Sequence, residues 1–329
     1  MIYTETKNTL NFLSMTRQIL DANTNTCYLS WLLMEQLDGN NVIHRISSSG
    51  IEVRILIGTR DIWCRDYMPI QIYENKYIGY EYTPDYLEHH GSMQTNLQTN
   101  PARILVRLGI DVTQSGIILD GGNVIKTNKG IIMVDKIFKE NEHLRKDILV
   151  NRLENYFENE IIFLPWDKAE IYGHADGIVR YIENGRVLMS NYHQYDKAFA
   201  DEYLRILSKH FDVEVLDYNV ENPCKFNWCY INFLRISNKI FIPQLEYEDY
   251  SGQGCEAAPL RWYESEGRKI KTKSKPRWYH KHIEEDDQAL EQFKRIFPNC
   301  EIIQVSCPRI VEKGGGLHCI SWNVKEENT

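Results

Sequence analysis

The sequence predicts an α/β fold built from five copies of one unit that runs strand, strand, helix, strand. Paired apolar runs separated by short polar turns recur along the chain, as in residues 121–135, 176–190 and 230–244. A helical apolar pattern and one more apolar run follow each pair. Polar junctions between Asp66 and Asn232 recur at intervals of 57, 53 and 56 residues. Such a period indicates a radial repeat.

Four of the units are continuous in the chain. Turn residues between β-rich runs predict each hairpin, and apolar residues at helical spacing predict each helix. The expected hairpins are residues 69–82, 121–135, 176–190 and 230–244. The expected helices are residues 93–108, 143–157, 197–211 and 287–299. The expected last strands are residues 110–114, 160–166, 212–218 and 300–307.

The fifth unit is predicted to be split between the two ends of the chain. Residues 26–33, a helix within 35–49 and residues 52–58 supply its end, and residues 318–324 supply the missing strand. A ring closed by strands from both termini leaves no exposed sheet edge. We therefore expect residues 1–329 to form a single domain.

One interval is too long for the repeat. Asn232 and Cys319 are 87 residues apart, which indicates an insertion at about 245–283. Within it, residues 268–281 carry seven Lys or Arg and no acid. This basic segment is either a solvated surface loop or a lid or contact for an acidic partner.

The composition excludes several classes of protein. A formal charge of −8 argues against a nucleic-acid binder. The chain has no apolar run of roughly 18–20 residues, so no membrane span is expected. The N-terminus lacks a secretory signal pattern, and the eight cysteines include no CxxC pair, which favours a cytoplasmic protein with reduced thiols and no structural zinc.

Unusual polar residues stand at the same place in every unit, just before the next hairpin. The junctions read DIWCRDYMP (61–69), LDGGNV (119–124), YGHADG (172–177), NWCYINF (227–233) and KGGGLHC (313–319). Equivalent junctions of a radial repeat converge near its axis, so we expect one pocket lined by the following residues: Trp63, Asp66, Asp120, Asn123, His174, Asp176, Asn232 and Cys319.

These residue types favour nucleophilic catalysis on a cation. Each has a structural alternative, such as an ion pair for Asp66 or a buried small hydrophobe for Cys319, but their coincidence at the junctions favours a site. A cysteine with a histidine and carboxylates can act as a nucleophile. Two carboxylates match the N–H forks of a guanidinium, and the indole of Trp63 can stack on it.

At these motifs the sequence resembles the agmatine deiminase and bacterial, Porphyromonas-type peptidyl-arginine deiminase family of the pentein, or guanidino-modifying, superfamily. The matching motifs are DIWCRDYMP, LDGGNV, GHADGIVRY, CYINF and GGGLHCIS, over residues 61–321. The resemblance implies a five-bladed, pseudo-fivefold α/β propeller, in agreement with the repeat count.

The resemblance also implies roles. Cys319 matches the nucleophile, His174 the general acid and base, and Asp66 and Asp176 the carboxylates that bind the guanidinium. Trp63 and Asn232 match residues that line the substrate. We further expect substrate contacts from Asp120, Asn123, Glu170, Gly315 and Gly316.

The expected activity is hydrolysis of a guanidino C–N bond, without metal or cofactor. Cys319 attacks the guanidinium carbon, His174 protonates the departing ammonia and then activates water. Agmatine, giving N-carbamoylputrescine, is the favoured substrate because the chain is acidic and carries Glu170 near His174. Alternatives are peptidyl-arginine or free arginine, an amidinotransferase, and a binding propeller without catalysis. A homo-oligomer is compatible with the sequence.

Overall fold

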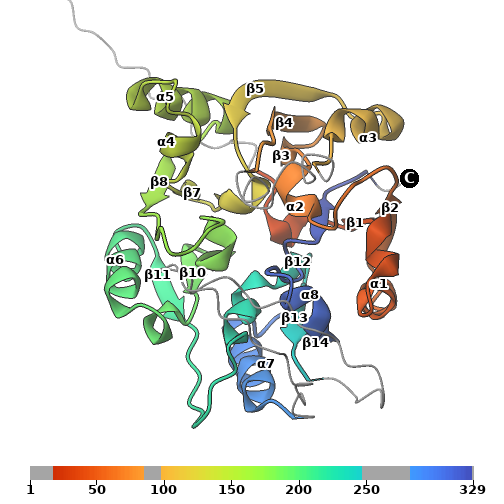
Figure 1. Cartoon of the computed structure of the whole chain (residues 1–329), viewed down its shortest axis with the longest axis vertical. Coiled ribbons are helices and arrows are strands. Elements are labelled where there is room, and N and C mark those ends of the chain that lie inside the picture. The colour runs from red at the N-terminus through yellow and green to blue at the C-terminus, as the bar shows by residue number, and fades with distance from the viewer. Residues whose placement is uncertain (1–17, 85–97, 247–281, 328–329) are drawn as a thin grey trace, which may run out of the picture.

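The computed structural model describes residues 18–84, 98–246 and 282–327 (Figure 1). Within these ranges the strands form five sheets of three strands each. Their orders are β15-β1-β2, β3-β4-β5, β6-β7-β8, β11-β10-β9 and β12-β13-β14. The five predicted units therefore correspond to five sheets in a mixed α/β fold. Most of the predicted insertion, including its basic segment 268–281, lies outside the described residues.

Each sheet has the same internal order. Its middle strand pairs antiparallel with the first strand and parallel with the third, and a helix connects the middle strand to the third. The strands of the four continuous units are β3 (Ile70–Tyr73), β4 (Lys76–Glu81), β5 (Val112–Ile118), β6 (Ile125–Lys126), β7 (Ile131–Val134), β8 (Ile161–Leu164), β9 (Val179–Glu183), β10 (Arg186–Met189), β11 (Asp212–Val215), β12 (Leu234–Ile236), β13 (Lys239–Gln244) and β14 (Glu301–Ser306). Their helices are α3 (Pro101–Leu108), α4 (Ile137–Glu140), α5 (Lys146–Phe157), α6 (Lys197–Leu207) and α7 (Glu284–Ile296). The predicted strand-strand-helix-strand order is confirmed.

The split fifth unit is also confirmed. β1 (Thr26–Ser30) pairs parallel with β2 (Glu52–Leu56) across α1 (Gly39–Ser47). On its other side, β1 pairs antiparallel with β15 (Ser321–Val324), for example Cys27 opposite Asn323. In Figure 1 the blue C-terminal strand accordingly lies with the red N-terminal strands.

Local sequence explains the boundaries of these elements. The Asp196 side chain accepts hydrogen bonds from the amides of Ala198 and Phe199 in the first turn of α6. Ala200, Tyr203 and Leu207 form the buried face of this helix at helical spacing. The β9–β10 hairpin turns at Asn184-Gly185, where both residues have positive φ. Asparagine and glycine adopt this conformation at least cost.

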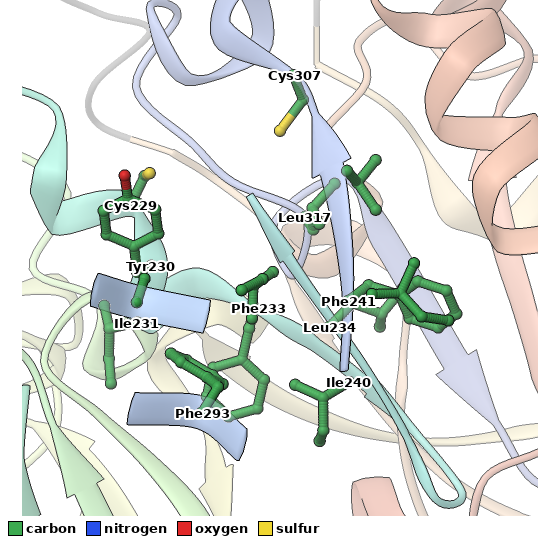
Figure 2. Packing of buried hydrophobic residues seen from close by; sticks show 14 of the residues in the cluster. Cys229, Tyr230, Ile231, Phe233, Leu234, Ile240, Phe241, Phe293, Cys307 and Leu317 are labelled. Carbon is green, nitrogen blue, oxygen red and sulfur yellow. The ribbon is translucent and has the colours of Figure 1, made fainter. Parts of the chain in front are cut away.

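Three clusters of buried hydrophobic residues hold the sheets and helices together. Figure 2 shows part of the largest, where Phe293 of α7 points at Phe233 beside β12. Their ring centroids are 5.1 Å apart in an edge-to-face arrangement, the preferred geometry for aromatic pairs. Within the described ranges, no helix is long and apolar enough to cross a bilayer.

Short helical turns form four of the five junctions between one unit and the next. They are α2 (Cys64–Tyr67), η5 (Gly121–Asn123), η6 (Ala175–Gly177) and η8 (Asn227–Asn232). The fifth junction, residues 313–319, follows α8 (Pro308–Val311) and contains no helix. In Figure 1 the elements of the five units follow one another around the middle of the view. The junctions thus bring residues far apart in the sequence to one place.

Candidate active site

A cavity of about 600 Å³ opens between four of the five junctions. This volume is in the usual range for small-molecule sites. Eight of the residues predicted for the site line the cavity: Trp63, Asp66, Glu170, His174, Asp176, Asn232, Gly315 and Cys319. The junctions therefore bring the predicted nucleophile, histidine and both carboxylates together.

His174 precedes η6 and stands between two carboxylates. Its Nε2 lies 3.0 Å from Asp120 Oδ2, and its Nδ1 lies 3.6 Å from Asp66 Oδ1. Burial by itself disfavours the charged imidazolium, but Asp66, Asp120 and Asp176 together raise the pKa of His174 to about 10. At neutral pH the ring is therefore an imidazolium that can give a proton to a leaving group.

Asp66, in α2, is fixed by a backbone amide. The N–H of Gly122 donates to Asp66 Oδ1 at 3.0 Å. A Cβ at Gly122 would lie 2.7 Å from His174 Nδ1 and 2.8 Å from Asp66 Oδ1, so only glycine fits here. Burial, with repulsion from Asp120 and Asp176, raises the pKa of Asp66 to about 7, against the attraction of His174.

Asp176 is held by a residue that follows it by 142 positions. His318 Nδ1 lies 2.7 Å from Asp176 Oδ2. Burial and the nearby charges of Arg180 and Arg65 lower the pKa of His318 to about 3, so His318 is neutral and donates this hydrogen bond. Burial raises the pKa of Asp176, but the bond from His318 and the charges of His174 and Arg180 outweigh it and lower the pKa to about 2.

Cys319 is partly exposed to the cavity and is held through its backbone. Asn232 Oδ1 accepts hydrogen bonds from the amides of Gly316 and Cys319, each at 3.1 Å. Cys319 Sγ lies 3.6 Å from Asp176 Oδ2. Burial and the carboxylates of Asp176 and Asp66 raise the thiol pKa well above its usual value, so the free protein holds a thiol rather than a thiolate.

Trp63 is packed against the glycine-rich segment that leads to Cys319. A Cβ on Gly315 would lie 2.3 Å from Cζ3 of the Trp63 ring. The absence of a side chain at residue 315 therefore lets the indole reach the cavity.

Three predicted contact residues lie outside the lining of this cavity. Asp120 stands behind His174, as described above. Asn123 holds the end of β7 through two hydrogen bonds. Its side chain donates one to Val134 O at 3.1 Å and accepts one from Val134 N at 2.7 Å. At Gly316 a Cβ would collide with Asn232, so its role is close packing.

Glu170 lines the cavity, but its carboxylate is engaged locally. It accepts hydrogen bonds from the amides of Tyr172 and Gly173, and so fixes the loop before His174. Burial raises the pKa of this carboxyl group.

The described residues include no group of three or more His, Cys, Asp or Glu side chains placed to hold a metal ion. The seven cysteines in the described part of the chain are all free. The titratable groups of the predicted catalytic residues at the cavity are a thiol, an imidazolium and two carboxylates.

Comparison with known proteins identifies the family. Residues 8–257 and 277–324 match the model of Porphyromonas-type peptidyl-arginine deiminases. The chain belongs to this family. The match includes all five junctions and every residue of the cavity discussed above.

This member of the Porphyromonas-type peptidyl-arginine deiminase family is similar to several known proteins in sequence or in fold. The "Putative agmatine deiminase" of Legionella pneumophila is 25% identical over 231 residues, which cover 62% of this chain and 55% of the relative. The chain thus spans little more than half the length of that relative. The agmatine deiminase of C. jejuni matches 97% of this chain and 99% of its own, with 18% identity and a TM-score of 0.66. DDAH from Pseudomonas aeruginosa matches 91% of this chain and 99% of its own, with 10% identity and a TM-score of 0.52. These structures share the fold.

Sequence reasoning missed several residues at the site of this family member. His318 lies directly before the predicted nucleophile Cys319 in the motif GGGLHC, and this position could have identified it as a residue of the site. Trp166, Tyr172 and Trp228 also line the cavity. They lie near the junctions, but single aromatic residues in a sequence do not reveal which way their rings point.

Proposed function

We propose that this protein hydrolyses a guanidino compound to a ureido compound and ammonia, with Cys319 as the nucleophile. The observation that carries the proposal is the convergence of Cys319, His174, Asp66 and Asp176 on one cavity. The relatives' names, agmatine deiminase among them, support the same chemistry.

Asp66 and Asp176 bind the guanidinium group in this proposal. Carboxylates pair with its N–H groups through charge-assisted hydrogen bonds, and the Trp63 ring covers a face of the cation. Removing water from the cavity strengthens each of these interactions.

Substrate binding also prepares the nucleophile. The same carboxylates that raise the pKa of the Cys319 thiol are neutralised when a guanidinium cation binds between them. The thiol pKa then falls, and the proton leaves to solvent through the open cavity. The enzyme therefore forms its thiolate only when the substrate is present.

The reaction proceeds in two halves. The thiolate attacks the guanidinium carbon, and the imidazolium of His174 gives its proton to one amino group, which leaves as ammonia with the electron pair of the broken C–N bond. Neutral His174 then takes a proton from water, whose oxygen attacks the thiouronium carbon. Expulsion of the Cys319 thiolate and loss of the hydroxyl proton to solvent leave the ureido product. Asp120 keeps the imidazole oriented through both halves.

The favoured substrate is agmatine. Asp167, Glu170 and Asp196 line the cavity and suit a second cationic group, although Lys225 and Lys313 also line it. Those lysines favour arginine or an arginyl peptide end as the alternative, because its carboxylate would meet them.

We also propose that the five units close into a pseudo-fivefold propeller, with the active site near its axis. The split β15-β1-β2 sheet, the five equivalent junctions and the likeness to pentein structures support this arrangement.

The deciding experiment measures ammonia and the ureido product together, with agmatine, free arginine and a C-terminal-arginine peptide. Equal amounts of both products with agmatine as the best substrate support the proposal. Substrate consumed without an equal amount of ammonia, with transfer of its amidino group to an added amine, indicates an amidinotransferase. A tenfold higher kcat/KM for either arginine compound assigns the deiminase to that substrate instead.

A further inference from the structure

A second, much smaller cavity lies next to His318. Its volume is about 30 Å³, and the first strand of each of the five sheets contributes a polar side chain to its lining. These side chains are Gln71 in β3, Lys126 in β6, Arg180 in β9, Arg235 in β12 and Asn323 in β15. The reaction proposed above uses none of them.

The lining of this cavity has an excess of positive charge. Arg65, Lys126, Arg180 and Arg235 line it together with a single carboxylate, Asp21. Asp21 is already engaged, since its Oδ2 lies 2.7 Å from an Arg180 nitrogen.

Two further carboxylates act on the cluster from outside the cavity, and they do not balance it. Glu183 lies 3.8 Å from Arg235 and is nearly half exposed. Asp176 attracts Arg180 but lines the active-site cavity. Among the described residues, four cations thus face three carboxylates, and uncompensated charge inside a protein is costly.

One buried donor in this cluster has no partner in the part of the chain that the structure describes. Arg235 is 5% exposed, and its Nε makes no hydrogen bond to the described residues, although one of its terminal nitrogens donates to the carbonyl of Ile182. Buried guanidinium N–H groups are normally satisfied. Arg235 lines the cavity, and an acceptor bound beside its Nε would satisfy this group.

The pKa values of Lys126 and Asp21 also indicate an excess of positive charge at this cavity. Burial and the positive charge of Arg65 lower the pKa of Lys126 to about 8, against the attraction of Asp21. Burial alone would raise the pKa of Asp21, but Arg180, Arg65 and Lys126 hold it far below its usual range. A negative charge is thus strongly favoured at this place in the fold.

We propose that this cavity is a binding site for one halide-sized monovalent anion, held by Arg65, Lys126, Arg180 and Arg235. A volume of about 30 Å³ is enough for one small group, since a single water needs roughly 10–15 Å³, and it suits a chloride or bromide ion. Asp21, which also lines the cavity, has a side chain that is 29% exposed.

The test compares the full-length protein in chloride, bromide and gluconate at equal ionic strength. We expect Tm to rise by about 1–3 °C, saturably, when chloride or bromide reaches about five times its dissociation constant, and not to rise in gluconate. Lys126→Met and Arg235→Gln should remove this response. Lys129→Met is the matched control, because Lys129 binds a surface carbonyl outside the cavity and its loss should leave the response intact.

Crystals grown in bromide provide a measurement that needs no variant. An anomalous peak inside this cavity supports the site. Equal Tm values in all three salts, or a bromide crystal without a peak in the cavity, would overturn the proposal, and neither measurement needs a variant that folds. A full chloride response in folded Lys126→Met would overturn it as well.

Discussion

His318 Nδ1 donates a hydrogen bond to Asp176 Oδ2 at 2.7 Å, and both side chains are almost completely buried. The same carboxylate oxygen lies 3.6 Å from Cys319 Sγ. Cys319 follows His318 directly in the chain. One short segment therefore fixes both the position of the nucleophile and the orientation of the Asp176 carboxylate beside it.

Replacing His318 by alanine should therefore lower kcat/KM by about 10–100-fold, the usual cost of losing a hydrogen bond to a charged group. Asp176 would remain in the cavity but rotate more freely. Steady-state kinetics measure the loss. His193→Ala is the matched control, since His193 pairs with Asp217 at 3.0 Å on the surface, and its removal should leave kcat/KM unchanged. Equal activity of His318→Ala and the control would show that the pair is dispensable.

Cys319→Ala should abolish turnover, by roughly 10³-fold or more, while the substrate still binds. The change removes one sulfur atom, and Asn232 still holds the backbone amide of residue 319. Calorimetry with agmatine measures substrate binding, and product assays measure turnover. Cys300→Ser, at a cysteine outside the cavity, should keep full activity. More than a tenth of wild-type kcat in Cys319→Ala contradicts the covalent mechanism.

Asp66→Asn and Asp176→Asn should each reduce kcat/KM by about 10²–10³-fold, because charge-assisted bonds to the guanidinium are lost in a site shielded from water. Asp217→Asn is the matched control, because it removes an exposed carboxylate outside the site and should leave kcat/KM unchanged. Losses below about fivefold in both site variants would indicate that these carboxylates serve the fold and do not bind substrate.

The repeat was predictable from the sequence because its signals are local. Hairpin turns such as Asn184-Gly185 and the apolar spacing of helices such as Lys197–Leu207 depend on neighbours within a few residues. The split unit was predictable from the period. Four complete copies leave a strand, a helix and a strand unassigned at the N-terminal end of the chain, and one strand unassigned at the C-terminal end.

The pairings inside the site were not predictable, because they depend on side-chain directions across the fold. His318 and Asp176 are 142 residues apart, and the sequence does not show which oxygen faces which nitrogen. The same reason explains why Asn123, although part of a junction, turns to the β7 backbone instead of the cavity.

Asp120→Asn should move the alkaline limb of the pH profile of kcat/KM to lower pH. The pKa of His174 is about 10 although burial opposes its charge, because Asp66, Asp120 and Asp176 stabilise the imidazolium. Asparagine keeps the shape of residue 120 but removes one of these negative charges, so the folded-state pKa of His174 falls. The proton that His174 donates to the leaving ammonia is then lost at lower pH.

The size of the shift follows from the geometry of the pair. Asp120 Oδ2 lies 3.0 Å from His174 Nε2, so its loss should move the limb by about one pH unit or more. Since kcat/KM reports groups of the free enzyme, the limb is measured there and not in kcat. Glu214→Gln, which removes a carboxylate paired with Arg186 outside the cavity, should leave the limb in place. An unchanged limb in Asp120→Asn would mean that a group other than His174 supplies the proton.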